Sequence, residues 1–92
     1  MILDILTPEA QIFHGEVEFV SMPGLAGQFQ VLKGHAAIIS ALKQGELRFK
    51  TNMDLSDQES LIKDQKSPQV YIYNLKGGVA EMLGDKVVVL AE

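Results

Sequence analysis

Glu46-Leu-Arg-Phe-Lys50 is the stretch of this sequence that decides the fold. Apolar and charged side chains alternate in it without a break. Leu47 and Phe49 therefore share one face of an extended chain, and the three charged residues share the other. A period of two is typical of a strand with one buried and one solvated face. We therefore expect a β-strand here, packed against a core.

Other segments of the chain have a similar strand-like composition. They are residues 16–20, 28–32, 70–73 and 87–90. The run 87–90 is apolar throughout, which predicts a strand covered on both faces. Glycine and proline turn signals separate these segments at short intervals, and this spacing predicts an all-β sandwich or barrel.

Two parts of the chain leave alternatives open. Residues 36–42 have the composition of one or two helical turns, but Gly34 and Gly45 leave little room, so we interpret them as a strand. Residues 51–68 are polar and acidic, and Ser56 with Glu59 has the spacing of a helix capping box. We favour a mobile loop between two hairpin strands. Its composition predicts that it buries little and can be trimmed at small cost in stability.

Length and composition limit the class of protein. A chain of 92 residues is the size of one small domain, here 1–92 with the polar insert at about 52–68. It has no cysteine, and its net charge of −4 offers no basic surface for nucleic acid. No apolar stretch approaches the roughly 20 residues that span a bilayer. We expect any contact with a membrane to be made through partner subunits.

The sequence offers no constellation of catalytic or metal-binding residues. His14 and His35 lie on different expected elements, without the spacing of metal ligands. Glu16 and Glu18 are expected on the outward face of one strand, as a solvated pair rather than a general acid and base. No phosphate-binding loop is present. We therefore expect no cofactor, no metal and no enzymatic activity.

The motifs nonetheless occur in a familiar order. They lie in residues 3–9, 13–17, 20–29, 34–36, 42–48, 77–79 and 87–91. In order and spacing the chain resembles the N-terminal β-sandwich domain of the epsilon subunit of F-type ATP synthase, outside the insert. This resemblance implies a flattened antiparallel sandwich of about ten short strands.

The resemblance also implies a function. In that family the domain lies in the central stalk, between the gamma subunit and the membrane c ring. It is a non-catalytic rotor subunit there, and it couples proton translocation to ATP synthesis in the catalytic head. It would be peripheral, on the cytoplasmic side of the energy-coupling membrane, with no nucleic acid partner. The alternative is a stand-alone β-sandwich module that binds carbohydrate or peptide. Such modules commonly present aromatic side chains for stacking on sugars, and this chain has no tryptophan and only Tyr71 and Tyr73 for that purpose.

Two surfaces follow from the resemblance by position. The c-ring interface would comprise Leu25, Ala26, Gly27, Gln28 and His35. The gamma interface would comprise Thr7, Ile38 and Ser40. Leu25 and Ala26 give a small independent indication, because apolar side chains at a turn tip favour a contact with a partner.

The chain departs from the family pattern in three respects. Gln30, Lys33 and Ala37 stand where family members usually have a glycine and two prolines, which leaves that loop freer in the unfolded chain. The insert replaces a much tighter turn. The sequence ends at Glu92, where family members ordinarily continue into a helical hairpin that regulates ATP hydrolysis and in some members binds ATP. We therefore do not assign those activities.

Overall fold

The computed structural model describes residues 1–34 and 36–92, and this part of the chain contains ten β-strands. They are β1 (Ile2–Leu6), β2 (Gln11–Glu16), β3 (Phe19–Gly24), β4 (Gly27–Leu32), β5 (Ile38–Leu42), β6 (Gly45–Lys50), β7 (Leu61–Lys63), β8 (Val70–Leu75), β9 (Gly78–Leu83) and β10 (Lys86–Ala91). The expected all-β class is confirmed. None of the described residues forms a helix that is long and apolar enough to cross a membrane.

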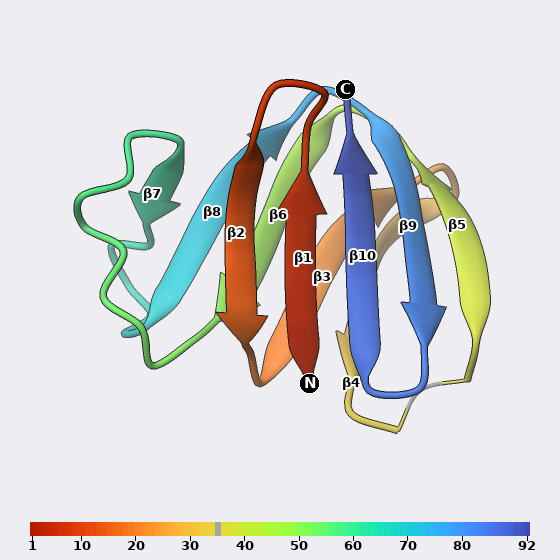
Figure 1. Ribbon diagram of the computed structural model, residues 1–92, viewed down its shortest axis with the longest axis horizontal. Helices are drawn as coiled ribbons and strands as arrows, with labels where there is room; N and C mark the ends of the chain where they lie inside the picture. Colours follow the sequence, from red (N-terminus) through yellow and green to blue (C-terminus); the bar gives the residue numbers. More distant parts are fainter. Residues whose placement is uncertain (35) are drawn as a thin grey trace.

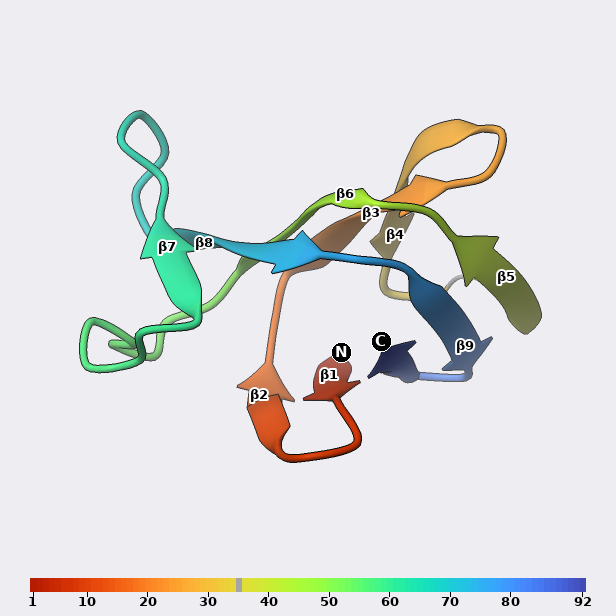
Figure 2. The same ribbon diagram turned by 90° about the horizontal axis from the view of Figure 1, so that it is seen from above.

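The strands form one sheet that curls into two layers. Its order is β2-β1-β10-β9-β5-β3-β6-β8-β7, with β4 paired to β3. Viewed from above, β2, β1, β10 and β9 make one layer, and β3, β6 and β8 make the other (Figure 2). The two layers join at β5, which pairs along its length with β9 but touches β3 only through Leu42 and Gly24. This narrow junction is where the sheet turns over to enclose the core.

Strand pairing is antiparallel except at the centre of the first layer. There β1 pairs with β10 in parallel, with Leu3 opposite Val87 and Ile5 opposite Val89. The first and last strands of the fold therefore lie side by side, as Figure 1 shows. Alternation then directs these four side chains into the space between the layers, where all are buried.

Aromatic packing connects the two layers. The rings of Phe13 on β2 and Phe49 on β6 have centroids 4.5 Å apart, and Phe49 also stacks on Tyr71 of β8 at 6.2 Å. Phe49 and Leu47 are fully buried, whereas Glu46, Arg48 and Lys50 face outward. The alternation that predicted a one-sided strand at residues 46–50 is thus confirmed.

The expected strand over residues 16–20 is wrong. The chain crosses there from one layer to the other, so β2 ends at Glu16 and β3 begins at Phe19. The Val17 N–H donates to the Met1 carbonyl in the first layer, and the Glu18 N–H donates to the Lys50 carbonyl in the second. This change of partner breaks the alternation, which no local pattern could reveal.

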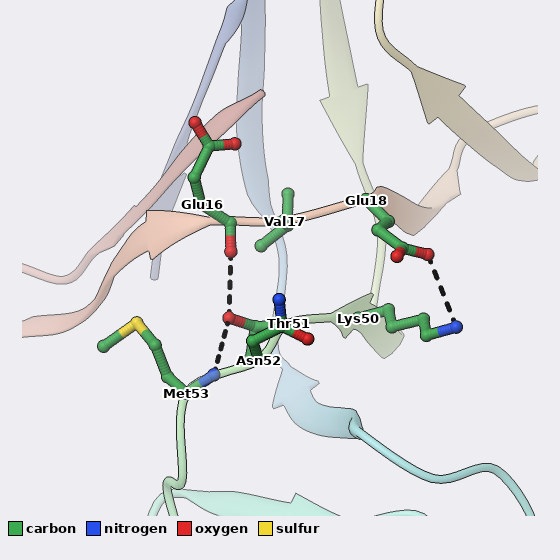
Figure 3. Close-up of a pocket in the computed structure, with 7 residues that line it drawn as sticks. All are labelled: Glu16, Val17, Glu18, Lys50, Thr51, Asn52 and Met53. Atoms are coloured by element: carbon green, nitrogen blue, oxygen red, sulfur yellow. Dashed lines mark hydrogen bonds and ion pairs between the residues drawn. The ribbon is translucent and has the colours of Figure 1, made fainter.

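The buried hydroxyl of Thr51 fixes this crossing. It donates to the Glu16 carbonyl at 2.9 Å and accepts from the Met53 N–H at 3.3 Å (Figure 3). Glu16 and Glu18 therefore do not share the outward face of one strand. Glu18 lies 3.4 Å from the Lys50 amine, and Glu16 lies 2.7 Å from the Met1 amine. The two acids point apart and hold separate partners.

The insert is not a mobile loop, and it is not a helix. β6 and β8 do pair as a hairpin, but the connection adds β7, which pairs with β8. Leu55 and Leu61 are buried in the core, and the Leu55 N–H donates to the Tyr71 hydroxyl at 3.1 Å. An ion pair between Arg48 and Asp64 ties the insert across β8 to β6. The expectation that this segment buries little is therefore wrong.

Asp4 is a buried acid on the outer side of the first layer. Its carboxylate lies 2.5 Å from the His14 Nδ1 and 3.4 Å from the Lys86 amine. Burial raises the pKa of Asp4, but the hydrogen bonds and charges of His14 and Lys86 outweigh burial, so the pKa lies below its usual value. The ionised carboxylate is thus a stabilising part of the folded state.

We expect acid to remove this stabilisation. A carboxyl group with a depressed pKa contributes stability above its unfolded pKa of about 3.9, and the contribution is lost as the pH falls through the lower folded value. Urea titrations between pH 7 and pH 2.5 should show a shallower decline in unfolding free energy for Asp4→Asn than for the wild type. Asp57→Asn, at an exposed acid in the insert, should keep the wild-type profile. Identical profiles for all three proteins would contradict the assignment.

Candidate functional site

The β3–β4 hairpin ends in an exposed apolar tip. Gly24 pairs with Gly27, so Leu25 and Ala26 form the two-residue turn, and Leu25 is 67% exposed. Gln28 follows the turn and reaches back over the sheet. Its side-chain amide donates to the Ser21 hydroxyl at 2.8 Å and to the Glu46 carbonyl at 3.1 Å. The hairpin is thereby held firmly while its tip stays in solvent.

A hollow lies between this tip and β5. It is lined by residues 24–29 of the hairpin and residues 39–41 of β5, none of which carries a charge. The structure thus brings Leu25 to Gln28, predicted for one interface, next to Ser40, predicted for the other. His35, the remaining residue predicted for the c-ring interface, lies outside the described residues.

The residues predicted for the gamma interface occupy two places. Ile38 and Ser40 lie on β5, where Ile38 is 44% exposed and Ser40 is half-buried. Register places them beside the core residues Met82 and Ala80, on the side of β5 opposite to Ile39. Thr7 lies in the β1–β2 turn, separated from β5 by β10 and β9. Its hydroxyl donates to the Ala10 carbonyl at 3.1 Å and accepts from the Ala10 N–H at 3.0 Å, so it also shapes the turn. A partner that contacts both places must extend over the first layer.

The outer side of that layer carries exposed apolar residues that the sequence analysis missed. They are Ile39 on β5, Val79 and Leu83 on β9, and Leu90 on β10. The expectation that residues 87–90 are covered on both faces is therefore wrong, since Leu90 is 55% exposed. The sequence did contain one indication of this surface. Val79, Glu81 and Leu83 are spaced by two residues and therefore share one face of a strand, and the charge of Glu81 indicates that this face is exposed to solvent.

The described residues contain no cluster suited to metal binding. Among residues 1–34 and 36–92, no three His, Cys, Asp or Glu side chains come together in a way that could hold a metal ion. The pocket in Figure 3 lies at the layer crossing and is lined by Glu16–Glu18 and residues 50–53, with its acids paired to cations. A small β-sandwich with an apolar hairpin tip defines a structural or binding module.

Comparison with known proteins identifies the module. The family model of the ATP synthase delta/epsilon chain β-sandwich domain matches residues 1–92. The ATP synthase epsilon chain of Chlorobium limicola is 41% identical and that of Chlorobaculum tepidum 40%, each over 98% of this chain and 86% of the relative. The chain therefore belongs to the delta/epsilon family of ATP synthase subunits, and the resemblance seen in the sequence is confirmed.

A solved structure confirms the fold. A chain in the central stalk and c-ring structure of the Tetrahymena thermophila mitochondrial ATP synthase aligns with a TM-score of 0.67 at 11% identity. The alignment covers 98% of this chain and 61% of that one. The two share a backbone architecture with little sequence in common.

Family membership also decides the question of catalysis. The epsilon chain is a structural and regulatory subunit of the ATP synthase and not its catalytic subunit, so the expectation of a non-enzyme is confirmed. It is a peripheral part of a membrane-associated complex. The alternative of a stand-alone module for carbohydrate or peptide is set aside.

Proposed function

We propose that this chain is a rotor subunit in the central stalk of an ATP synthase. In this role it links the gamma subunit to the c ring and couples proton translocation to ATP synthesis in the catalytic head. It lies on the cytoplasmic side of the energy-coupling membrane and reaches the membrane only through its partners. Family membership supports this proposal, and so does the fold of the Tetrahymena thermophila stalk chain.

The apolar hairpin tip is the observation that carries the proposed c-ring contact. Leu25 and Ala26 project from a hairpin whose base is fixed by the hydrogen bonds of Gln28. A firm turn with an apolar end loses little conformational freedom when it docks on a partner. Leu25 to Gln28 form the proposed c-ring surface, to which the family resemblance adds His35.

The proposed gamma contact lies on the first layer. Ile38 and Ser40 on β5 and Thr7 in the β1–β2 turn would face gamma. The family resemblance supports this assignment. The paired strands β1, β10, β9 and β5 form a continuous support beneath this contact, as a part that transmits torque requires.

Charging the tip tests the c-ring contact. We expect Leu25→Asp with Ala26→Asp to change the stability of the isolated chain by under about 0.5 kcal/mol, because both residues are exposed in the turn. The same two charges placed in an interface should weaken binding by several kcal/mol. The measurements are the melting temperature of the isolated chain and proton-driven ATP synthesis by the reconstituted enzyme.

The matched control is Ile62→Asp, which charges an exposed apolar residue on β7. β7 and the hairpin tip lie at opposite ends of the molecule (Figures 1 and 2). We expect the control to keep full coupling and the tip variant to lose it at an unchanged melting temperature. Full coupling in the tip variant would contradict the proposed c-ring surface.

A further inference from the structure

Met53 is the methionine of this chain whose side chain reaches solvent. The chain has four methionines, and Met1, Met22 and Met82 are buried in the core. Met53 lies near the start of the insert and is 46% exposed. A thioether is oxidised where the oxidant can reach its sulfur, so exposure decides which methionine reacts. The fold thus distinguishes one of four chemically equal groups.

Although it is half exposed, the Met53 side chain packs against β2. Gly15 of β2 has no Cβ, and one built there would lie 2.6 Å from the Met53 Sδ and 3.7 Å from its methyl carbon. The thioether therefore occupies the space that any side chain at position 15 would fill. Gly15 shares its face of β2 with the buried Phe13, so this space opens toward the core. Met53 thereby attaches the insert to the edge strand of the first layer.

The Met53 sulfur also lies at one end of the aromatic row that connects the two layers. The Phe13 Cζ is 3.1 Å from the same Cβ position, so the edge of this ring and the sulfur are neighbours. A thioether at a ring edge is a favourable contact. Phe13 packs on Phe49, which stacks on Tyr71, and the Tyr71 hydroxyl accepts from the Leu55 N–H. The start of the insert thus contacts both ends of the row, through Met53 and Leu55.

Two backbone hydrogen bonds report on this attachment. The Met53 N–H donates to the Thr51 hydroxyl at 3.3 Å, and the Met53 side chain extends away from that bond (Figure 3). The Leu55 N–H donates to the Tyr71 hydroxyl at 3.1 Å. Both acceptors are side-chain hydroxyls, so neither bond belongs to the ladder of the sheet. If this segment moves away from β2, the two N–H groups lose protection from exchange while the strands stay paired.

We propose that Met53 is a redox-modification site, at which hydrogen peroxide forms methionine sulfoxide and weakens the attachment of residues 53–55 to β2 and the aromatic row. The Sδ lone pair attacks one peroxide oxygen and the O–O bond breaks. The leaving hydroxide takes the proton of the transferred oxygen and departs as water, so the sulfur is oxidised by two electrons and the peroxide is reduced. The sulfoxide places a polar oxygen between a glycine and a ring edge, where it has lost water, and the side chain therefore turns outward.

Treatment of the purified, folded chain with hydrogen peroxide tests the site. We expect peptide mass spectrometry to show one added oxygen on Met53 at a rate at least tenfold above that of the three buried methionines. Amide exchange followed by NMR should then be at least fivefold faster for the Met53 and Leu55 N–H groups and unchanged within β10. Reduction by a methionine sulfoxide reductase with a dithiol should restore the original exchange rates.

Gly15→Ala and Met53→Leu separate this packing from simple exposure. The backbone at Gly15 does not have a positive φ, so alanine is accepted there, and its Cβ takes the place of the sulfur. The displaced Met53 should be oxidised at least threefold faster, and exchange of the Leu55 N–H should be faster even before peroxide is added. Met53→Leu keeps an apolar side chain over Gly15 without sulfur, so its amide exchange should not respond to peroxide.

Each result decides for or against the redox site. Selective oxidation of Met53 with faster exchange at Leu55 supports it. Comparable oxidation of all four methionines, or sulfoxide at Met53 with unchanged exchange at Leu55, overturns it. A peroxide response of Met53→Leu equal to that of the wild type also overturns it, because the effect then comes from another residue. None of these measurements requires assembly with other subunits, so their failure would leave the proposed function in the central stalk untouched.

Discussion

Replacing Leu61 by alanine is expected to destabilise the protein by about 2–4 kcal/mol, although the residue lies in a polar segment. Leu61 is only 6% exposed, and it packs in the core from the edge strand β7. Truncation removes most of a buried side chain and leaves a cavity beneath β7. Urea titration of the purified variant measures the loss. For a domain of this size it is a large part of the total stability.

Ile62 provides the matched control for Leu61. It is the next residue on the same strand, but it points outward and is 49% exposed. We expect Ile62→Ala to cost under about 1 kcal/mol. If both variants lost several kcal/mol, Ile62 would have to be packed as well, and β7 would not lie as described. If both lost under about 1 kcal/mol, the insert would be a dispensable loop.

The second large effect is expected at Gly78, the first residue of β9. Gly78 has φ of +149°, and a Cβ there would lie 2.2 Å from the Leu90 carbonyl oxygen. That oxygen belongs to the backbone of β10 and cannot move without disturbing the β9–β10 pairing. We expect Gly78→Ala to cost about 3 kcal/mol or more, from backbone strain together with this clash. Thermal or urea unfolding followed by circular dichroism measures the cost.

Gly84 separates the two contributions. It also has a positive φ, +62°, but a Cβ there meets nothing within 4 Å. Gly84→Ala should therefore cost only about 1–2 kcal/mol, the price of the left-handed conformation alone. Equal losses at the two glycines would show that the close approach at Gly78 contributes nothing.

Strands with one buried and one solvent-exposed face could be predicted from the sequence, because the alternation of apolar and polar residues is visible within the strand itself. Residues 46–50 and 28–32 each have buried residues on one face, and both are strands. Residues 16–20 were misassigned because Val17 and Val20 are both buried. Their burial reflects the crossing between layers, which depends on hydrogen bonds to Met1 and Lys50 far along the chain.

The sequence did not predict the buried residues of the insert or the exposed apolar residues of the first layer, and the reasons are related. Leu55 and Leu61 carry no periodic pattern, so their burial depends on β7 finding the edge of β8. Leu90 stands in a run of apolar residues that alternation cannot divide into faces. The hairpin tip at Leu25 and Ala26 was predicted as an exposed apolar turn, and the structure has it so. Its partner, like that of Thr7, Ile38 and Ser40, stays a prediction from the family.

The parallel pairing of β1 with β10 has a consequence for synthesis on the ribosome. The N-terminal strand emerges first, but its central neighbour in the sheet is the last strand of the fold, and all eight other described strands are made between them. Until residue 91 has left the exit tunnel, β1 has only the edge strand β2 beside it. Folding can therefore be completed only after residues 86–91 have left the exit tunnel, and such non-local closure is slow, on the order of milliseconds to seconds. During that interval the unpaired backbone edge of β1 is open to chaperones or to other nascent chains.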